Sequence, residues 1–192
     1  IRRHPTRGGG LLPADTGLVT DLRDRVRVLI QAVVLIVIGS AAIAAPSAEV
    51  SALSVVKVHA ISKDGSVAYG SAVAIARDVV ATACHVIRDA NDVLIVRGEI
   101  RSIATVRTGS ATHDICLLDV PNLDVSATSF RASTSLRTGE RVVAIGFPAG
   151  REQTRNEGVV EALYDFDAAH VIRTSAVFDF GASGGGLFDK DG

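Results

Sequence analysis

A chain of 192 residues, 47% hydrophobic but only 4% aromatic, is long enough to enclose the core of one full domain or of two small barrels. A formal net charge of −1, without a basic stripe interleaved with aromatic residues, argues against a nucleic-acid partner. Because valine, alanine and isoleucine supply most of the apolar mass, the composition favours strands and predicts an all-β fold.

The first 53 residues divide into a basic segment, a hydrophobic segment and a linker. Residues 1–27 carry six arginines against three aspartates and are expected to be disordered. The stretch 28–45, VLIQAVVLIVIGSAAIAA, has a length between that of a signal-peptide core and that of a membrane anchor. An A-x-A pattern at 42–44 favours a cleaved secretory signal over an uncleaved anchor, and a buried core helix is the third alternative. The first two alternatives predict export to the periplasm or the cell exterior, with membrane contact only through 28–45 if it is uncleaved and with 46–53 as a linker.

From Ser54 onward the pattern changes to short β-type runs separated by glycine, aspartate and serine. The stretch 121–140 is poor in large apolar residues and is interpreted as a connection between a first half, 54–120, and a second half, 141–192. The predicted strands are 55–60, 67–76, 78–84, 92–98, 101–107 and 115–120 in the first half, and 141–147, 157–164 and 170–178 in the second.

Three short motifs contain His85 (TACH), Asp114 (DICLL) and Ser183 (GASGGGL). Each is commonplace alone, since such residues often end strands or form turns. Together they supply the three groups that nucleophilic catalysis needs: a hydroxyl, a base that activates it, and a carboxylate that orients the base. The glycines leave room for two backbone N–H groups to face one oxyanion, with Gly181 and Ser183 as candidate donors. His113, adjacent to the aspartate, is expected to point away from it because strand residues alternate in direction.

With these motifs the sequence resembles the trypsin-like (chymotrypsin-fold) serine proteases, most closely their compact bacterial HtrA-like members. TACH is similar to the family's small-residue-then-His motif, DICLL to D-I-A-L-L, and GASGGGL to G-[DN]-S-G-G-P-L. AIGFPAG at 144–150 and NEGVVEAL at 156–163 are similar to segments of the HtrA-like members. The resemblance covers roughly 54–192.

The resemblance implies two packed six-stranded β-barrels, with His85 and Asp114 on the first and Ser183 on the second. It implies an exported serine endopeptidase that acts on polypeptides, including unfolded ones. The serine would attack a peptide carbonyl, the histidine would take and return the proton, and the aspartate would orient the histidine. No metal or organic cofactor is implied. Val177 and Phe178, just upstream of the serine, are candidates for lining the substrate pocket and indicate an uncharged substrate side chain there.

Three departures from the family pattern limit this inference. Ala182 stands where the family commonly has Asp or Asn, so activation by a salt bridge to a new amino terminus is not expected. Gly186 replaces the usual proline and removes a restraint on φ beside the oxyanion loop. Only nine residues follow Ser183, whereas the fold needs two further strands. The sequence therefore predicts an incomplete second barrel and inactivity of these 192 residues alone, and it leaves open a non-catalytic, protease-like binding module.

The two cysteines lie close to the candidate triad in sequence. Cys84 directly precedes His85, and Cys116 follows Asp114 by two residues and so shares its strand face. In an exported protein this placement predicts a Cys84–Cys116 disulfide, with two reduced core thiols as the alternative. A zinc site built from these four residues is a weaker alternative, because no C-x-x-C or H-x-x-x-H pairing supports it and Ser183 would go unexplained.

Overall fold

The computed structural model describes residues 52–192. The predicted basic segment, the signal or anchor segment and most of the linker, residues 1–51, lie outside the described residues. Within 52–192, no helix combines the length and the apolar character that crossing a bilayer requires.

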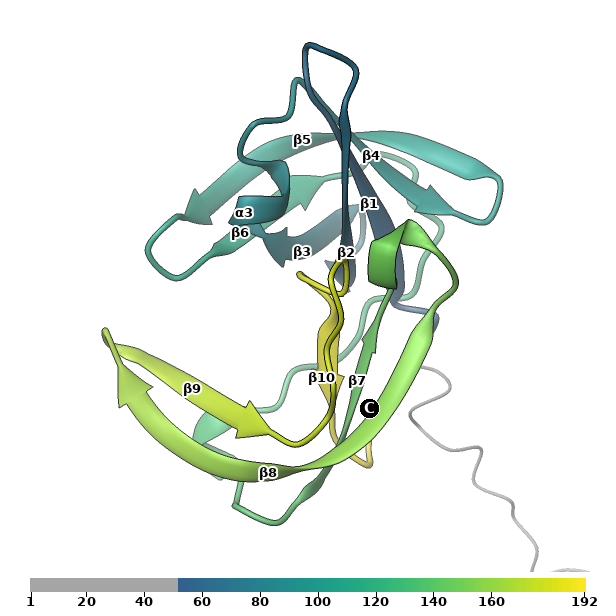
Figure 1. Cartoon of the computed structure of the whole chain (residues 1–192). Helices are drawn as coiled ribbons and strands as arrows, with labels where there is room; N and C mark the ends of the chain where they lie inside the picture. Colours follow the sequence, from purple (N-terminus) through teal and green to yellow (C-terminus); the bar gives the residue numbers. More distant parts are fainter. Residues whose placement is uncertain (1–51) are drawn as a thin grey trace, which may run out of the picture. The chain divides into compact units, whose positions relative to one another are not determined.

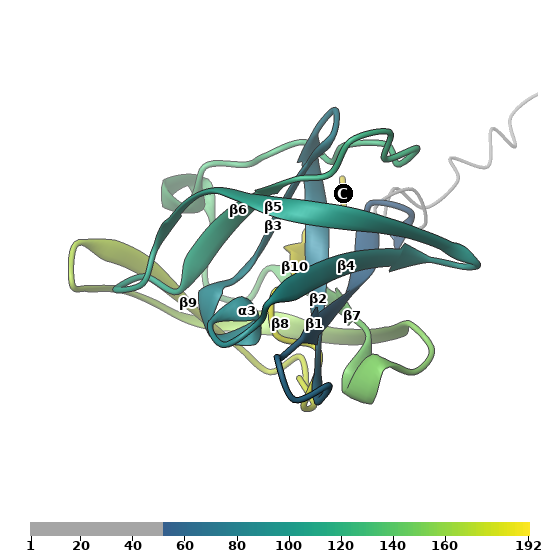
Figure 2. The same cartoon turned by 90° about the horizontal axis from the view of Figure 1, so that it is seen from above.

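The first half of the described chain forms a closed antiparallel barrel (Figure 1 and Figure 2). Around the barrel the strands follow the order β1-β2-β3-β6-β5-β4, and the pairing of β1 with β4 closes it. Closure pairs every strand on both sides and removes free edges. The strands are β1 (Val55–Ile61), β2 (Val67–Ala76), β3 (Val79–Ala83), β4 (Asp92–Arg97), β5 (Ile100–Ser110) and β6 (Ile115–Asp119).

Small and aliphatic side chains fill this barrel, and its buried cluster contains no aromatic residue. Val58, Ile95 and Leu118 are among its completely enclosed side chains. A narrow barrel has room for side chains of this size at each inward position but not for several large rings. The low aromatic content of the sequence is therefore explained by the shape of this core.

The second half forms an open four-stranded antiparallel sheet in the order β10-β7-β8-β9. Between sheet and first barrel lies a mainly apolar cavity of about 740 Å³, lined by Val73, Leu136 and Phe188 among others. The all-β prediction with an incomplete second barrel is thus confirmed. The strands are β7 (Arg141–Gly146), β8 (Thr154–Phe166), β9 (Ala169–Thr174) and β10 (Gly186–Phe188).

Two local predictions were wrong. Cys84 was expected to end a strand, but it begins the short helix α3 (Cys84–Ile87) directly after β3. β10 was not predicted, because it starts inside the glycine motif and its three residues are too few to show an alternating pattern. Its register against β7, with Leu187 opposite Ala144, is set by a partner strand distant in sequence.

Candidate active site

The pairing of β3 with β6 brings His85 and Asp114 together. These strands pair antiparallel with Ala83 opposite Ile115, so the residues that follow β3 meet those that precede β6. The N–H of Cys84 extends this pairing by donating to the Asp114 carbonyl at 3.2 Å. The separation of 29 residues in sequence is therefore closed by strand register alone.

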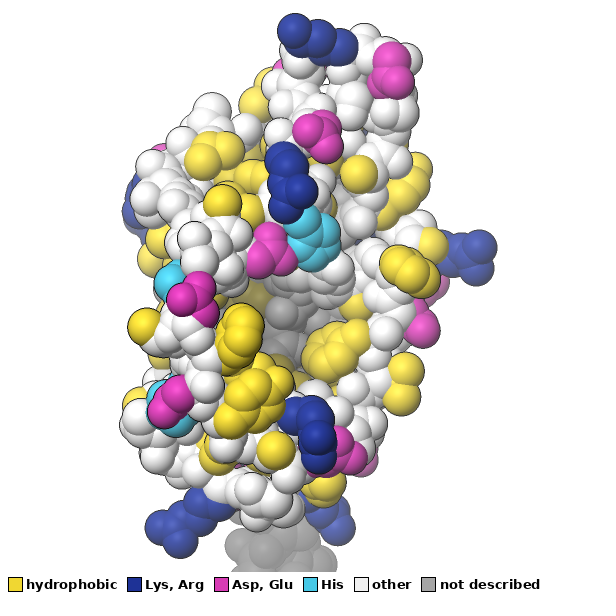
Figure 3. Space-filling model, turned by 60° about the vertical axis from the view of Figure 1, so that its left-hand side comes forward, with side chains coloured by type: hydrophobic (Ala, Val, Ile, Leu, Met, Phe, Trp, Pro, Cys, Tyr) yellow, Lys and Arg dark blue, Asp and Glu magenta, His cyan; other side chains and the backbone are white. Residues whose placement is uncertain are grey.

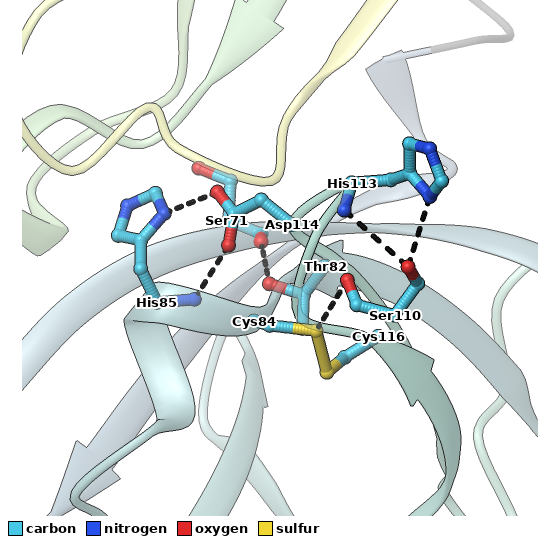
Figure 4. The surroundings of a disulfide bond; sticks show 8 residues. All are labelled: Ser71, Thr82, Cys84, His85, Ser110, His113, Asp114 and Cys116. Atoms are coloured by element: carbon cyan, nitrogen blue, oxygen red, sulfur yellow. Dashed lines mark hydrogen bonds and ion pairs between the residues drawn. A yellow bond between two sulfur atoms is a disulfide. The ribbon is translucent and has the colours of Figure 1, made fainter. Parts of the chain in front are cut away.

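The Asp114 carboxylate holds His85 at two points (Figure 4). Oδ2 lies 2.5 Å from His85 Nδ1, and Oδ1 accepts the His85 backbone N–H at 2.8 Å. Asp114 has a φ of +55°, a left-handed conformation that short polar residues such as aspartate adopt more readily than most. When Nδ1–H donates to the carboxylate, the lone pair of Nε2 is left free to accept a proton.

The carboxyl of Asp114 is held in its ionised form. Partial burial raises its pKa, but hydrogen bonds from the His85 ring and from its backbone N–H, together with the charge of Arg88, outweigh this effect. The net result is a pKa below the ordinary value for aspartate. The group is therefore a carboxylate at neutral pH and can stabilise a positive charge on the imidazole.

Cys84 and Cys116 form a disulfide next to this pair (Figure 4), with a Sγ–Sγ distance of 2.04 Å. Gly109 of β5 leaves the space for it, because a Cβ at that position would lie 2.6 Å from the Cys116 sulfur. The bond covalently joins the segment that carries His85 to the strand that follows Asp114.

Removing this disulfide is expected to lower the free energy of unfolding by about 3–4 kcal/mol, from the entropy of the loop that it closes. The double variant Cys84→Ala/Cys116→Ala, compared with the untreated protein in urea unfolding, measures the effect. Reductant should lower the stability of the natural protein but not that of the double variant. Equal stability of the natural protein with and without reductant would contradict the expectation.

Ser183 lies in a loop that turns twice within seven residues. The N–H of Ala182 donates to the Asp179 carbonyl (3.0 Å), and the N–H of Gly185 donates to the Ala182 carbonyl (2.9 Å). Gly181 and Gly184, with φ of +91° and +82°, allow these turns. Across residues 52–192 no hydrogen bond uses the N–H of Gly181 or of Ser183, so both groups can donate to a ligand.

The loop is attached to the first barrel at β2. The N–H of Ser71 donates to the Ser183 carbonyl at 2.8 Å, and Gly184 approaches the Ser71 carbonyl so closely that a Cβ would lie 2.2 Å from it. Within the described chain, the Ser183 hydroxyl makes no hydrogen bond to His85. Such bonds often form only when substrate is present.

A hollow of about 470 Å³ opens beside Ser183, lined by the loop residues and by Phe178, Asp179 and Phe180. Phe180 is 98% exposed. Val177 does not line this hollow, although its carbonyl is fixed by Asn156 Nδ2 at 2.9 Å. Figure 3 shows hydrophobic side chains gathered on one face of the molecule near a histidine and an acidic residue. Phe178 was among the predicted pocket residues, whereas Asp179 and Phe180 were not, although their positions just before the glycine motif were an available signal.

His113 is directed away from the His85–Asp114 pair (Figure 4). Its Nδ1 lies 2.9 Å from Ser110 Oγ, and its Nε2 lies 3.0 Å from the carbonyl of Asp167 in the β8–β9 turn. Both ring nitrogens therefore have partners, and the exposed side chain links the loop before β6 to the second half of the chain.

Curated relatives of this chain include bacterial serine proteases. It is 33% identical over 122 residues to the serine protease Do-like HtrB of Bacillus subtilis, covering 56% of this chain and 26% of that protein. It is 31% identical over 129 residues to a probable periplasmic serine endoprotease DegP-like of Hahella chejuensis, covering 64% and 28%. The chain thus spans about a quarter of the length of these relatives.

Solved structures of similar fold lead to the same family. The HtrA-type protease AlgW with tripeptide superposes with a TM-score of 0.70 at 25% identity, covering 76% of this chain and 50% of that one. The active form of the Rv3671c protease from M. tuberculosis gives 0.67 at 28% identity, covering 75% and 68%. Residues 70–192 match the sequence profile of the trypsin-like peptidase domain, and the chain belongs to this family.

Proposed function

We propose that this chain carries the active site of a serine endopeptidase, with Ser183 as nucleophile, His85 as general base and Asp114 as the group that orients the base. The observation that carries the proposal is that the Asp114 carboxylate makes two hydrogen bonds with His85, at 2.5 Å to ring Nδ1 and at 2.8 Å to the backbone N–H. A carboxylate that bonds both groups sets the tautomer and the direction of the imidazole at once.

The reaction follows from this arrangement. Ser183 Oγ attacks the carbonyl carbon of the scissile peptide, and its proton passes to His85 Nε2 as the carbonyl π electrons move to oxygen. The N–H groups of Gly181 and Ser183 donate to the resulting oxyanion. Collapse of this intermediate breaks the C–N bond, and the amine leaves with the proton from Nε2. Water then attacks the acyl-enzyme by the same route and releases the acid.

The substrate that we assign is a polypeptide outside the cytoplasm. The aromatic rings of Phe178 and Phe180 beside Ser183 favour an uncharged, apolar substrate side chain. The names of the relatives support the location, because several are described as periplasmic endoproteases. The hydrophobic stretch 28–45 is assigned as the export signal.

A non-catalytic binding module is the second candidate, favoured by one observation: the structure shows no hydrogen bond from the Ser183 hydroxyl to His85 among the residues it describes. Such a module would bind the same polypeptides through the hollow beside Ser183 without cleaving them. The two functions differ in the reactivity of one hydroxyl, which an electrophilic probe measures directly.

A fluorophosphonate probe should label the natural full-length protein at Ser183, as located by mass spectrometry, and should not label Ser183→Ala. Cleavage of unfolded casein should be lost in the same variant. A folded protein that binds casein but takes up no probe would contradict the peptidase and support the binding module.

A further inference from the structure

The buried Ser71 of β2 makes hydrogen bonds to three other parts of the chain. Its Oγ–H donates to the Gly181 carbonyl at 2.9 Å, and the same Oγ accepts the N–H of Phe147 at 2.9 Å. Its backbone N–H donates to the Ser183 carbonyl at 2.8 Å, and its carbonyl accepts Thr82 Oγ1–H at 2.7 Å (Figure 4). The residue is 0% exposed, so water cannot replace its hydroxyl.

The N–H groups of Gly181 and Ser183 point in directions set by the carbonyls before them. In a trans peptide the C=O and the following N–H are antiparallel, so a bonded carbonyl fixes the direction of the next N–H. The Phe180 carbonyl accepts the N–H of Ala149 at 2.7 Å. The Ala182 carbonyl is held by the turn within the loop, at 2.9 Å. Both candidate oxyanion donors therefore belong to peptides that are anchored on their carbonyl side.

Ser71 anchors the peptides that alternate with these two. Its hydroxyl holds the carbonyl of Gly181, and its N–H holds the carbonyl of Ser183. Its hydroxyl also accepts the N–H of Phe147, at the start of the turn that contains Ala149. The N–H of Ala149 in turn donates to the Phe180 carbonyl. We propose that Ser71 is a positioning residue of the peptidase, which fixes the orientation of both oxyanion donors from the first barrel; this inference rests on the proposed function.

The hydroxyl is suited to this task because it donates and accepts at the same time. Ser71→Ala would leave the Gly181 carbonyl and the Phe147 N–H without partners in a buried place. Gly181, at φ +91°, has the backbone freedom to rotate once its carbonyl is released. The donors would then lose their common direction, which weakens stabilisation of the oxyanion but removes no contact with the substrate side chain.

The test compares Ser71→Ala with Ser54→Ala in the natural full-length protein. Both variants lose the hydroxyl of a buried serine, but within residues 52–192 Ser54, just before β1, has no hydrogen bond to Ser71 or to the Ser183 loop. Saturation kinetics with a fluorophosphonate separate the maximal rate of Ser183 modification from the affinity for the probe. Ser71→Ala should lower the maximal rate about 10- to 100-fold with unchanged affinity, whereas Ser54→Ala should keep the natural rate. Ser71→Ala should also lower the Tm.

Equal maximal rates in the two variants would overturn the proposal. If Ser71→Ala does not fold, Ser71→Cys is the alternative variant, because a thiol is a weak donor of similar size. Its maximal rate should lie between those of Ser71→Ala and the natural protein, and an unchanged rate would overturn the proposal. Hydrogen exchange at the Phe147 amide gives a readout that is independent of the reaction: it should accelerate in the Ser71 variant and not in Ser54→Ala. If the natural protein takes up no probe, the proposed function fails, and unchanged exchange at Phe147 would overturn the anchoring role separately.

Discussion

Asp114→Asn is expected to lower kcat/KM for peptide hydrolysis by on the order of 10⁴-fold. An amide has one acceptor oxygen where the carboxylate uses two, for the His85 ring and for its backbone N–H. If the amide oxygen keeps the backbone bond, the NH₂ group faces Nδ1 and favours the tautomer with its proton on Nε2. That tautomer cannot accept the proton of Ser183, so the nucleophile stays unactivated. Steady-state kinetics on a peptide substrate measure the loss.

Asp119→Asn is the matched control for this variant. Asp119 lies at the other end of β6, where its carboxylate pairs with Arg107 and has no contact with His85. The control should keep its natural kcat/KM. A similar loss in both variants would show that the effect comes from β6 as a whole and not from the orientation of His85.

Asp114→Asn is also expected to alter how the stability of the folded protein responds to acid. The pKa of Asp114 in the folded protein lies below its ordinary value. The ionised carboxylate therefore stabilises the folded protein at pH values above that ordinary pKa. The contribution is lost as the pH falls through the lowered pKa. Asp114→Asn should therefore lose less unfolding free energy on acidification than the natural protein, as urea titrations at neutral and acidic pH would show.

Gly184→Ala is expected to lower the free energy of unfolding by about 2–5 kcal/mol and to abolish probe labelling of Ser183. Alanine at φ +82° is strained, and its Cβ would lie 2.2 Å from the Ser71 carbonyl and 2.8 Å from the N of Ala83. Both atoms belong to backbone of the closed barrel, which cannot move aside. The loop would have to lift away from the barrel, taking the serine with it.

Gly65→Ala is the control that separates backbone strain from the steric clash of a Cβ at Gly184. Gly65 has nearly the same φ, +83°, but a Cβ there meets no atom within 4 Å. Its substitution should cost only the strain of the backbone, about 1–2 kcal/mol. Equal losses in the two alanine variants, measured in urea, would contradict the steric argument for Gly184.

Local patterns in the sequence were sufficient to predict nine of the strands and the position of the triad motifs. The short β-type run VAYGSAVAIA marked β2 at its observed bounds, Val67–Ala76. The role of Ser71 had no such signal, because its partner Gly181 lies 110 residues away and a serine within a strand is unremarkable by itself. The bonds from Ser71 to the Ser183 carbonyl and from Ala149 to the Phe180 carbonyl likewise join segments distant in sequence.

The closed barrel and the open sheet differ in how readily each comes apart. The barrel that carries His85 and Asp114 has no unpaired strand, whereas β9 and β10 each pair on one side only within the described residues. Units with fewer internal bonds open at lower free energy than the rest of a protein. Within the described residues, the sheet strands β9 and β10 are therefore expected to open at lower free energy than the barrel strands that carry His85 and Asp114.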